Sequence, residues 1–158
     1  KYDHVVSIEM IEAVGERFWP TYFGQLAALL KPGGRCVVQA ITIADELFAR
    51  YRRGTDFIQR HVFPGGMLPS PAAVRRQAGR VGLQVLDDFA FGADYARTLA
   101  HWQRRFEAQL GAVRAQGFDE RFIRMWRFYL AYCEAGFNTG DVDVHHYVFA
   151  HGDGGGRG

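Results

Sequence analysis

The chain has 158 residues, 48% hydrophobic and 15% aromatic, which suits one compact domain that buries roughly 70% of its unfolded-chain surface. This composition excludes low-complexity disorder except in the glycine-rich tail, residues 152–158, which we expect to be disordered. A net charge of +2 gives no reason to expect a nucleic-acid partner.

Arginines gather at three places in the sequence, and two interpretations of them stay open. The first is an ordinary solvated helix face. The second is contact with an anionic partner such as a lipid head group. The clusters are Arg50, Arg52, Arg53 and Arg60, then Arg75, Arg76 and Arg80, then Arg104 and Arg105.

The cysteines and the hydrophobic runs give no indication of a disulfide-rich, zinc-binding or membrane-spanning protein. Cys36 and Cys133 are too few and too far apart for a disulfide framework or a zinc site, so we interpret both as core residues. No apolar run approaches 18 residues and no signal peptide opens the chain, so we expect a cytoplasmic protein. The chain has no initiator Met and enters a strand at once, which indicates a fragment.

Residues 2–43 predict a βαβ unit. Residues 2–8 are rich in β-branched side chains, which favours a strand. Residues 16–31 have helical periodicity and precede Pro32-Gly33-Gly34, which indicates a helix stop and a turn. Residues 35–43 are almost all apolar, as in a strand buried on both faces of a parallel sheet.

Residues 45–82 predict short helices around a turn-rich loop. The first segment, 45–61, favours helix in pieces, and residues 63–70 (FPGGMLPS) are rich in turn formers. Ser70 suits an N-cap and Pro71 the first turn of a helix that ends near Gly82.

Residues 83–151 predict two strands that flank two long helices. We expect a strand over residues 83–91 and a helix that Asp94 caps and Gly117 ends. A second helix covers residues 119–137, and the alternating pattern of residues 142–151 predicts a last strand. We expect the two strands to pair antiparallel.

The predicted fold class is α/β, with a candidate ligand site at one edge of the sheet. Sheets of this kind bind ligands outside the carboxyl ends of their strands, which here are residues 7–9 and 39–43. The sequence holds no glycine-rich nucleotide turn, P-loop, H-E-x-x-H helix or G-x-S-x-G elbow. Composition and periodicity alone therefore stop at an α/β domain.

Five segments, in order, resemble the cyclopropane-fatty-acyl-phospholipid synthases and the related mycolic acid cyclopropane synthases, over residues 2–151. The segments are DHVVSIEMIEAVG from Asp3, Tyr22-Phe23 with LKPGG from Leu30, FPGGMLPS from Phe63, FGADYARTL from Phe91 and RMWRFYLAYCEAGF from Arg124. The resemblance implies the C-terminal part of a Rossmann-like, S-adenosylmethionine-dependent methyltransferase over residues 1–151: its last four strands, with helical insertions.

The same resemblance implies a reaction. The double bond of an unsaturated phospholipid acyl chain attacks the sulfonium methyl group of S-adenosylmethionine, and a bound bicarbonate removes a proton so that a cyclopropane ring closes. The protein would orient the alkene, exclude water and hold the base. The implied partners are acyl chains at the inner face of the membrane, with peripheral membrane contact, no nucleic acid and no metal; a homo-oligomer stays open.

Site residues are carried over position by position. The resemblance implies a bicarbonate site of Glu12, Gln39, Ile41 and Tyr95, and a cofactor contact at Ser7 and Ile8. Gln39 departs from the family, which has a His there; an amide donates and accepts but cannot become cationic. Glu12 would either accept the O–H of bicarbonate or be protonated itself.

Structural interpretations of these residues stand beside the functional ones. Glu12 is also consistent with a surface carboxylate at a helix start, Gln39 with a strand amide satisfied by its neighbours, and Tyr95 with a core aromatic. His145 and His146 are adjacent on a strand and point to opposite faces, so we interpret them as structural and not as metal ligands.

Two other functions remain open at this point. One is methyl transfer without ring closure, which gives a branched or methylene-bearing chain and which Gln39 leaves open. The other is a non-catalytic, truncated fragment that binds lipid or a partner. We also expect the isolated chain to be inactive and to bind S-adenosylmethionine weakly, because the glycine turn and acidic residues that hold this cofactor are not in this sequence.

Overall fold

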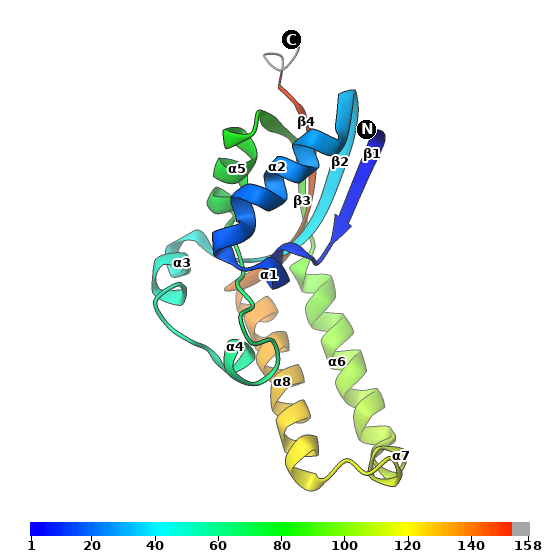
Figure 1. The fold of residues 1–158 in the computed structure, drawn as a ribbon. Coiled ribbons are helices and arrows are strands. Elements are labelled where there is room, and N and C mark those ends of the chain that lie inside the picture. The colour runs from blue at the N-terminus through cyan, green and yellow to red at the C-terminus, as the bar shows by residue number, and fades with distance from the viewer. Residues whose placement is uncertain (153–158) are drawn as a thin grey trace. The chain divides into compact units, whose positions relative to one another are not determined.

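The computed structural model describes residues 1–152 and contains a four-stranded sheet in the order β1-β2-β4-β3 (Figure 1). β1 pairs parallel with β2, and β3 pairs antiparallel with β4. The strands are β1 (Tyr2–Ile8), β2 (Leu30–Ile43), β3 (Leu83–Ala90) and β4 (Val142–His151). The predicted α/β class and the antiparallel final pair are confirmed; residues 153–158 of the predicted disordered tail lie outside the described residues.

Two compact units make up the chain. Among the described residues, the first comprises Lys1–Ala90 and residues 144–152, and the second is Phe91–Asp143. The first unit holds the sheet and the βαβ segment, and the second holds two long helices.

The connection from β1 to β2 contains α1 (Ile11–Val14), the 3-10 helix η1 (Glu16–Phe18) and α2 (Trp19–Leu29). The helix predicted over residues 16–31 stops at Leu29, and β2 starts at Leu30 instead of at residue 35. Leu30 is extended and fully buried, and it pairs with Tyr2 of β1. The register then shifts across Pro32-Gly33-Gly34. The two strands approach closely here, and a Cβ on Gly34 would lie 2.7 Å from the carbonyl oxygen of Asp3.

After β2, short helices and a loop return the chain to the sheet. The helices are α3 (Asp45–Tyr51), α4 (Phe57–His61) and α5 (Pro71–Arg80). Ser70 accepts the N–H of Ala73 at 3.3 Å, which confirms it as the N-cap of α5. Asp56 and Gln59 form a capping box at the start of α4.

One face of the sheet forms the core of the first unit. Helices α2 and α5 both pack on this face, against Cys36 and Val38 of β2 and Tyr147 and Phe149 of β4 (Figure 1). Burial raises the pKa of the Cys36 thiol to about 11, which agrees with its interpretation as a core residue. Val37, Gln39 and Ile41 on the opposite face of β2 are half-buried, so the prediction of a strand fully buried on both faces is wrong.

The second unit is a helical hairpin of α6 (Gly92–Ala108), α7 (Leu110–Ala115) and α8 (Glu120–Thr139). The predicted cap at Asp94 is wrong. The N-cap is Phe91, three residues earlier, where the Asp143 carboxylate accepts the Gly92 N–H at 2.7 Å, and Asp94 binds Arg97 instead. The first helix ends at Ala108, before the predicted Gly117, while Asp119 caps α8 through the Phe122 N–H. No helix within residues 1–152 has the length and apolarity to cross a membrane.

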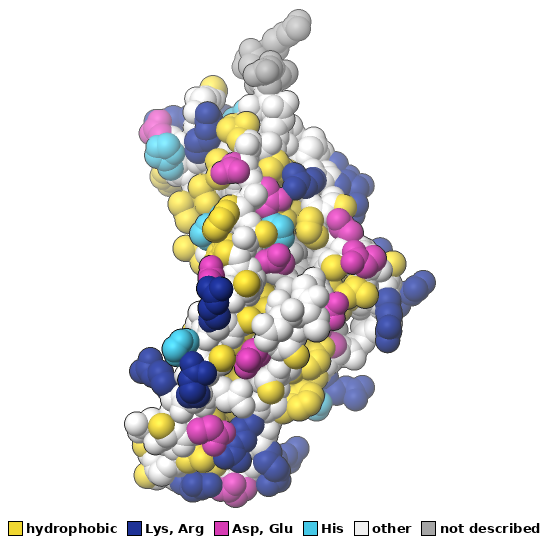
Figure 2. Space-filling view, turned by 180° about the vertical axis from the view of Figure 1, so that it is seen from behind, with side chains coloured by type: hydrophobic (Ala, Val, Ile, Leu, Met, Phe, Trp, Pro, Cys, Tyr) yellow, Lys and Arg dark blue, Asp and Glu magenta, His cyan; other side chains and the backbone are white. Residues whose placement is uncertain are grey.

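Basic side chains are spread over the surface and many are paired. Figure 2 shows dark blue Lys and Arg side chains in several groups with magenta acidic side chains between them. This distribution favours the interpretation as solvated faces over a single patch for an anionic partner. The paired arginines are Arg52 with Glu16, Arg75 with Asp88, Arg97 with Asp94, Arg114 with Glu120 and Arg127 with Glu107.

Candidate functional site

The carboxyl ends of β1 and β2 lie side by side, as the sequence predicted. Ser7 pairs with Val38 and Ile8 with Gln39, and the Glu9 N–H donates to the Gln39 carbonyl oxygen at 2.9 Å. Glu9 has a φ of 49°, in the left-handed region, which costs an L-residue about 1–2 kcal/mol. Strained residues of this kind cluster at functional sites, so this edge is a candidate site on backbone geometry as well.

Glu12 follows β1 in α1 and turns back to the end of β2. Its Oε1 accepts the Ile41 N–H at 2.6 Å, and its Oε2 is buried with no hydrogen-bond partner among the described residues. Burial raises the pKa of this carboxyl, an effect that hydrogen bonds from the backbone N–H groups of Glu12 and Ile41 oppose. The interpretation of Glu12 as an ordinary surface carboxylate is therefore wrong. A carboxyl held in this way can donate when protonated and accept when ionised.

Gln39 lies in the middle of a hydrogen-bonded row that joins Glu9, which follows β1, to His146 on β4. Its Nε2 donates to Glu9 Oε1 at 2.8 Å, and its Oε1 lies 2.7 Å from Nε2 of His146 on β4. The ring of His146 also lies 6.5 Å from that of Phe89. The sequence interpretation treated His146 as structural only; it missed this contact because the partners lie 107 positions apart.

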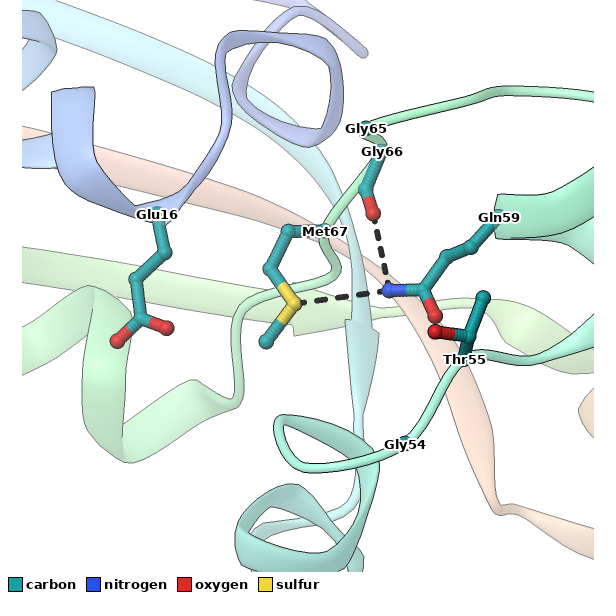
Figure 3. Close-up of a pocket in the computed structure, with 7 residues that line it drawn as sticks. All are labelled: Glu16, Gly54, Thr55, Gln59, Gly65, Gly66 and Met67. Carbon is teal, nitrogen blue, oxygen red and sulfur yellow. Dashed lines mark hydrogen bonds between the residues drawn. The ribbon is translucent and has the colours of Figure 1, made fainter.

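The turn-rich FPGGMLPS segment holds both ends of the site in place. The Met67 N–H donates to the Glu12 carbonyl oxygen at 2.8 Å, and the Ile43 N–H donates to the Pro69 carbonyl oxygen at 3.0 Å. Gln59 of α4 steadies the turn, since its Nε2 donates to the Gly66 carbonyl oxygen at 3.0 Å and lies 3.8 Å from Met67 Sδ (Figure 3).

A cavity of about 300 Å³ lies beside this turn (Figure 3). The side chains of Glu16, Thr55, Gln59 and Met67 line it, together with backbone of the glycine turn. It belongs to the same loop network that fixes Glu12. The sequence predicted a turn over the FPGGMLPS segment. In the structure this turn donates a hydrogen bond to the Glu12 backbone and accepts one from Ile43.

Ser7 and Ile8, the predicted cofactor residues, face opposite sides of β1. Ser7 is buried, and its Oγ accepts the hydroxyl of Tyr22 at 2.7 Å. Burial raises the pKa of Tyr22 to about 12, so this hydroxyl stays protonated and keeps donating. The Ile8 side chain is 64% exposed. Of the two side chains, Ile8 is therefore the one accessible to a ligand.

Tyr95 lies in the second unit, near the start of α6. Its ring packs at 5.7 Å from that of Phe91 and at 5.4 Å from that of Phe137, and it is half-buried. This environment suits both interpretations of Tyr95, a core aromatic and a hydroxyl donor at a site. The structure thus brings Glu12, Gln39 and Ile41 together in the first unit and holds Tyr95 within the second.

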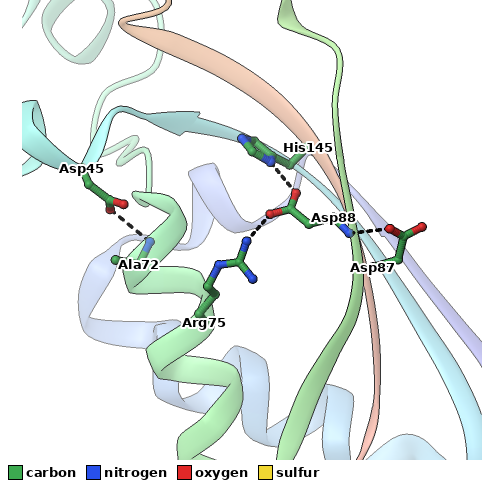
Figure 4. Close-up of polar contacts among 6 residues, drawn as sticks. All are labelled: Asp45, Ala72, Arg75, Asp87, Asp88 and His145. Atoms are coloured by element: carbon green, nitrogen blue, oxygen red, sulfur yellow. Dashed lines mark hydrogen bonds and ion pairs between the residues drawn. The ribbon is translucent and has the colours of Figure 1, made fainter.

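A second polar cluster lies on the core face of the sheet. Asp88 of β3 binds Arg75 of α5 and the Nδ1 of His145, each at 2.5 Å, and the His145 ring stacks on Tyr147 (Figure 4). His145 and His146 face opposite sides of β4, as predicted, and the contacts of His145 are with Asp88 and Tyr147. No cluster of three or more His, Cys, Asp and Glu side chains suited to a metal occurs in the part of the chain that the structure describes.

Comparison of the sequence with known proteins gives consistent matches. The family profile described as mycolic acid cyclopropane synthetase matches residues 1–147. Tuberculostearic acid methyltransferase UfaA1 of Mycobacterium tuberculosis is 45% identical over 149 residues, which cover 94% of this chain and 35% of that protein. The cyclopropane-fatty-acyl-phospholipid synthase of Escherichia coli K12 is 32% identical over 157 residues, which cover 96% of this chain and 38% of that protein. The chain thus spans little more than a third of these curated relatives.

Solved structures give the same match. The cyclopropane synthase MmaA2 from Mycobacterium tuberculosis superimposes with a TM-score of 0.83 at 25% identity, over 94% of this chain and 55% of that one. The mycolic acid cyclopropane synthase CmaA1, complexed with SAH and CTAB, superimposes with a TM-score of 0.83 at 28% identity, over 93% of this chain and 54% of that one.

Proposed function

The chain belongs to the mycolic acid cyclopropane synthetase family, and from this premise we propose that the full-length protein transfers a one-carbon group from S-adenosylmethionine to the double bond of an unsaturated phospholipid acyl chain. The observation that carries the proposal is the Glu12 carboxyl. It has a raised pKa and a buried, unpaired Oε2, and it lies at the carboxyl edge of the parallel strand pair.

Glu12 and Gln39 fit a small oxyanion that carries an O–H group. The Oε2 of Glu12 can accept such an O–H when ionised, or donate to the anion when protonated, while the Ile41 N–H keeps Oε1 in place. In the proposal Gln39 adds an amide donor, and the Tyr95 hydroxyl adds a further donor. Bicarbonate bound there would supply the base of the reaction.

Ser7 and Ile8 are the proposed contacts for the methionine part of the cofactor. S-adenosylmethionine supplies the electrophilic methyl group when bound. The exposed Ile8 side chain provides an apolar surface beside that group, and Ser7 fixes the strand end through its hydrogen bond with Tyr22. Residues 1–151 are, in this proposal, the C-terminal part of the methyltransferase domain, which is inactive without the rest.

Ring closure is the first candidate outcome, because the unpaired Glu12 oxygen offers a place for the base that ring closure needs. Methyl transfer without ring closure is the second candidate. It is favoured by the relative with 45% identity, which is named a methyltransferase, and by Gln39 at the position where the resemblance implies a His.

We also propose that the protein acts peripherally, at the inner face of the membrane. The second unit exposes Trp102 of α6 by 52% and Phe128 of α8 by 51%, and Phe118, which precedes α8, is exposed by 42%. Exposed aromatic rings suit contact with the interfacial and upper acyl region of a bilayer.

The test is product analysis. The full-length protein is incubated with S-adenosylmethionine and vesicles of phospholipids with unsaturated chains, and the released fatty acids are separated by gas chromatography and assigned by mass spectrometry and proton NMR. Ring protons identify a cyclopropane, and branch-methyl or methylene signals identify the second candidate. Vesicles with only saturated chains are the control. If the unsaturated chains stay unchanged, the proposed function is wrong.

A further inference from the structure

The row formed by Glu9, Gln39 and His146 has one consistent arrangement of hydrogens. A carboxylate only accepts, so the Gln39 amide must turn its nitrogen toward Glu9, where the distance is 2.8 Å. Its oxygen then faces His146 at 2.7 Å. Because an amide oxygen only accepts, the His146 Nε2 carries the proton and donates. Glu9 and His146 thus fix the Gln39 amide from its two ends.

The geometry points to His146 as a positioning residue for Gln39, with the Gln39–His146 pair replacing the His that the family resemblance implies at position 39. This inference rests on the proposed function. The imidazole is present at the same edge of the sheet, but it comes from β4 and acts through the amide on β2. These strands are neighbours in the sheet, so the substitution needs no change of fold.

Glu9 determines which end of the Gln39 amide faces it, and His146 holds the other end. Without the donor from His146, the amide oxygen loses this hydrogen bond and the amide is held at the Glu9 end alone, so it rotates more freely about its last torsion. An oxyanion held by Glu12 and Gln39 would then meet a donor that is less precisely oriented.

The experiment uses variants of the full-length protein in the vesicle assay. His146→Phe keeps a ring beside Phe89 and removes the donor, so we expect kcat to fall about tenfold, the size of one lost hydrogen bond, with KM within about twofold. His146→Gln keeps an N–H donor and should retain most of kcat. The double variant Gln39→His with His146→Gln exchanges the two side chains, and it should be more active than Gln39→His alone.

A measurement without turnover keeps this inference separable from the proposed function. Hydrogen exchange of the Gln39 side-chain amide, followed by NMR with ¹⁵N-labelled glutamine, should become about tenfold faster in His146→Phe and stay slow in His146→Gln. Thermal unfolding checks that the variants remain folded. An inactive wild type whose amide exchange responds in this way refutes the function and supports the positioning.

Three results would overturn the inference. The first is a wild type that is active while His146→Phe has the same kcat and the same amide exchange. The second is a His146→Gln variant as impaired as His146→Phe, because restoring an N–H donor would then not restore turnover. The third is an exchanged double variant no better than Gln39→His, because the two side chains would then act independently.

Discussion

Replacing Glu12 by Gln keeps the shape of the side chain and removes its acid chemistry. The Gln oxygen can still accept the Ile41 N–H, which now lies 2.6 Å from Glu12 Oε1, and the amide nitrogen then takes the place of the buried Oε2. The interaction lost is the one that Oε2 would make with the base. A hydrogen bond to a charged group contributes about 1.5–3 kcal/mol, so turnover should fall on the order of ten- to a hundredfold.

Glu12→Gln should lower turnover but raise stability relative to the wild type as the pH rises. Burial raises the pKa of Glu12 above its ordinary 4.5, so the folded protein holds this proton where the unfolded chain has released it. The contribution of the group to stability is therefore fully present below about pH 4.5 and is lost as the pH rises through the raised, folded-state pKa. Gln does not titrate and has no such loss. The melting temperature of the variant minus that of the wild type should therefore increase from acid to neutral pH.

The assay pairs kcat in the vesicle reaction with calorimetric melting from acid to neutral pH. Glu46→Gln is a matched control, because Glu46 is an exposed carboxylate in the first turn of α3, where a surface charge contributes about 0–1 kcal/mol. Its activity should equal that of the wild type. A Glu12→Gln protein with full activity, or one that loses activity only as it unfolds, would refute the reasoning.

Three other changes test separate parts of the structure. Tyr95→Phe keeps the packed ring, so in the full-length protein turnover should fall about tenfold while the melting temperature stays unchanged; a drop in melting temperature without loss of turnover would make Tyr95 a core residue. Gln59→Glu keeps the acceptor for the capping box but places a carboxylate against the Gly66 carbonyl oxygen, and calorimetry should show a loss of about 1–3 kcal/mol. Gly34→Ala puts a methyl group 2.7 Å from the Asp3 carbonyl oxygen and should destabilise by about 1–3 kcal/mol in urea unfolding; unchanged stability would contradict the close approach of β1 and β2.

Local signals in the sequence predicted most of the elements. Ser70 followed by Pro71 predicted the N-cap and the first residue of α5 as the structure has them, because an N-cap depends only on its own turn of helix. The alternating residues 142–151 matched β4 at both ends, because the pattern that favours a strand lies within the strand's own sequence. Asp119 capped α8 for the same local reason.

Errors occurred where a distant residue decided the local structure. Leu30 continued the helical period of α2, but burial in the core and pairing with Tyr2 made it the first residue of β2. Asp94 was a plausible cap by sequence. The cap was instead set by Asp143, 51 positions from Gly92, which accepts the first N–H of α6. Tertiary contacts override local propensity in both cases.

The sequence predicted where the site residues lie, but not the burial and the raised pKa of Glu12. Family resemblance placed Glu12, Gln39 and Ile41 at one edge of the sheet, and the structure brings them together there. The burial that raises the pKa of Glu12 is a property of the closed fold, to which the turn carrying Met67 contributes a hydrogen bond to the Glu12 backbone. No pattern within a few residues of Glu12 encodes it.

Gln39 is a second case in which position was predictable and environment was not. The family resemblance identified Gln39 as a departure from the expected His, but it gave no sign that another residue supplies an imidazole nearby. An isolated amide at that position lacks the imidazole that the family resemblance implies. The sheet order places β4 beside β2, and His146 then lies within hydrogen-bond distance of the amide. A substitution at a site is therefore best judged together with the residues on the neighbouring strand. If the exchanged pair Gln39→His with His146→Gln is active, the unit on which function depends is the amide–imidazole pair, and neither residue alone predicts the effect of changing it.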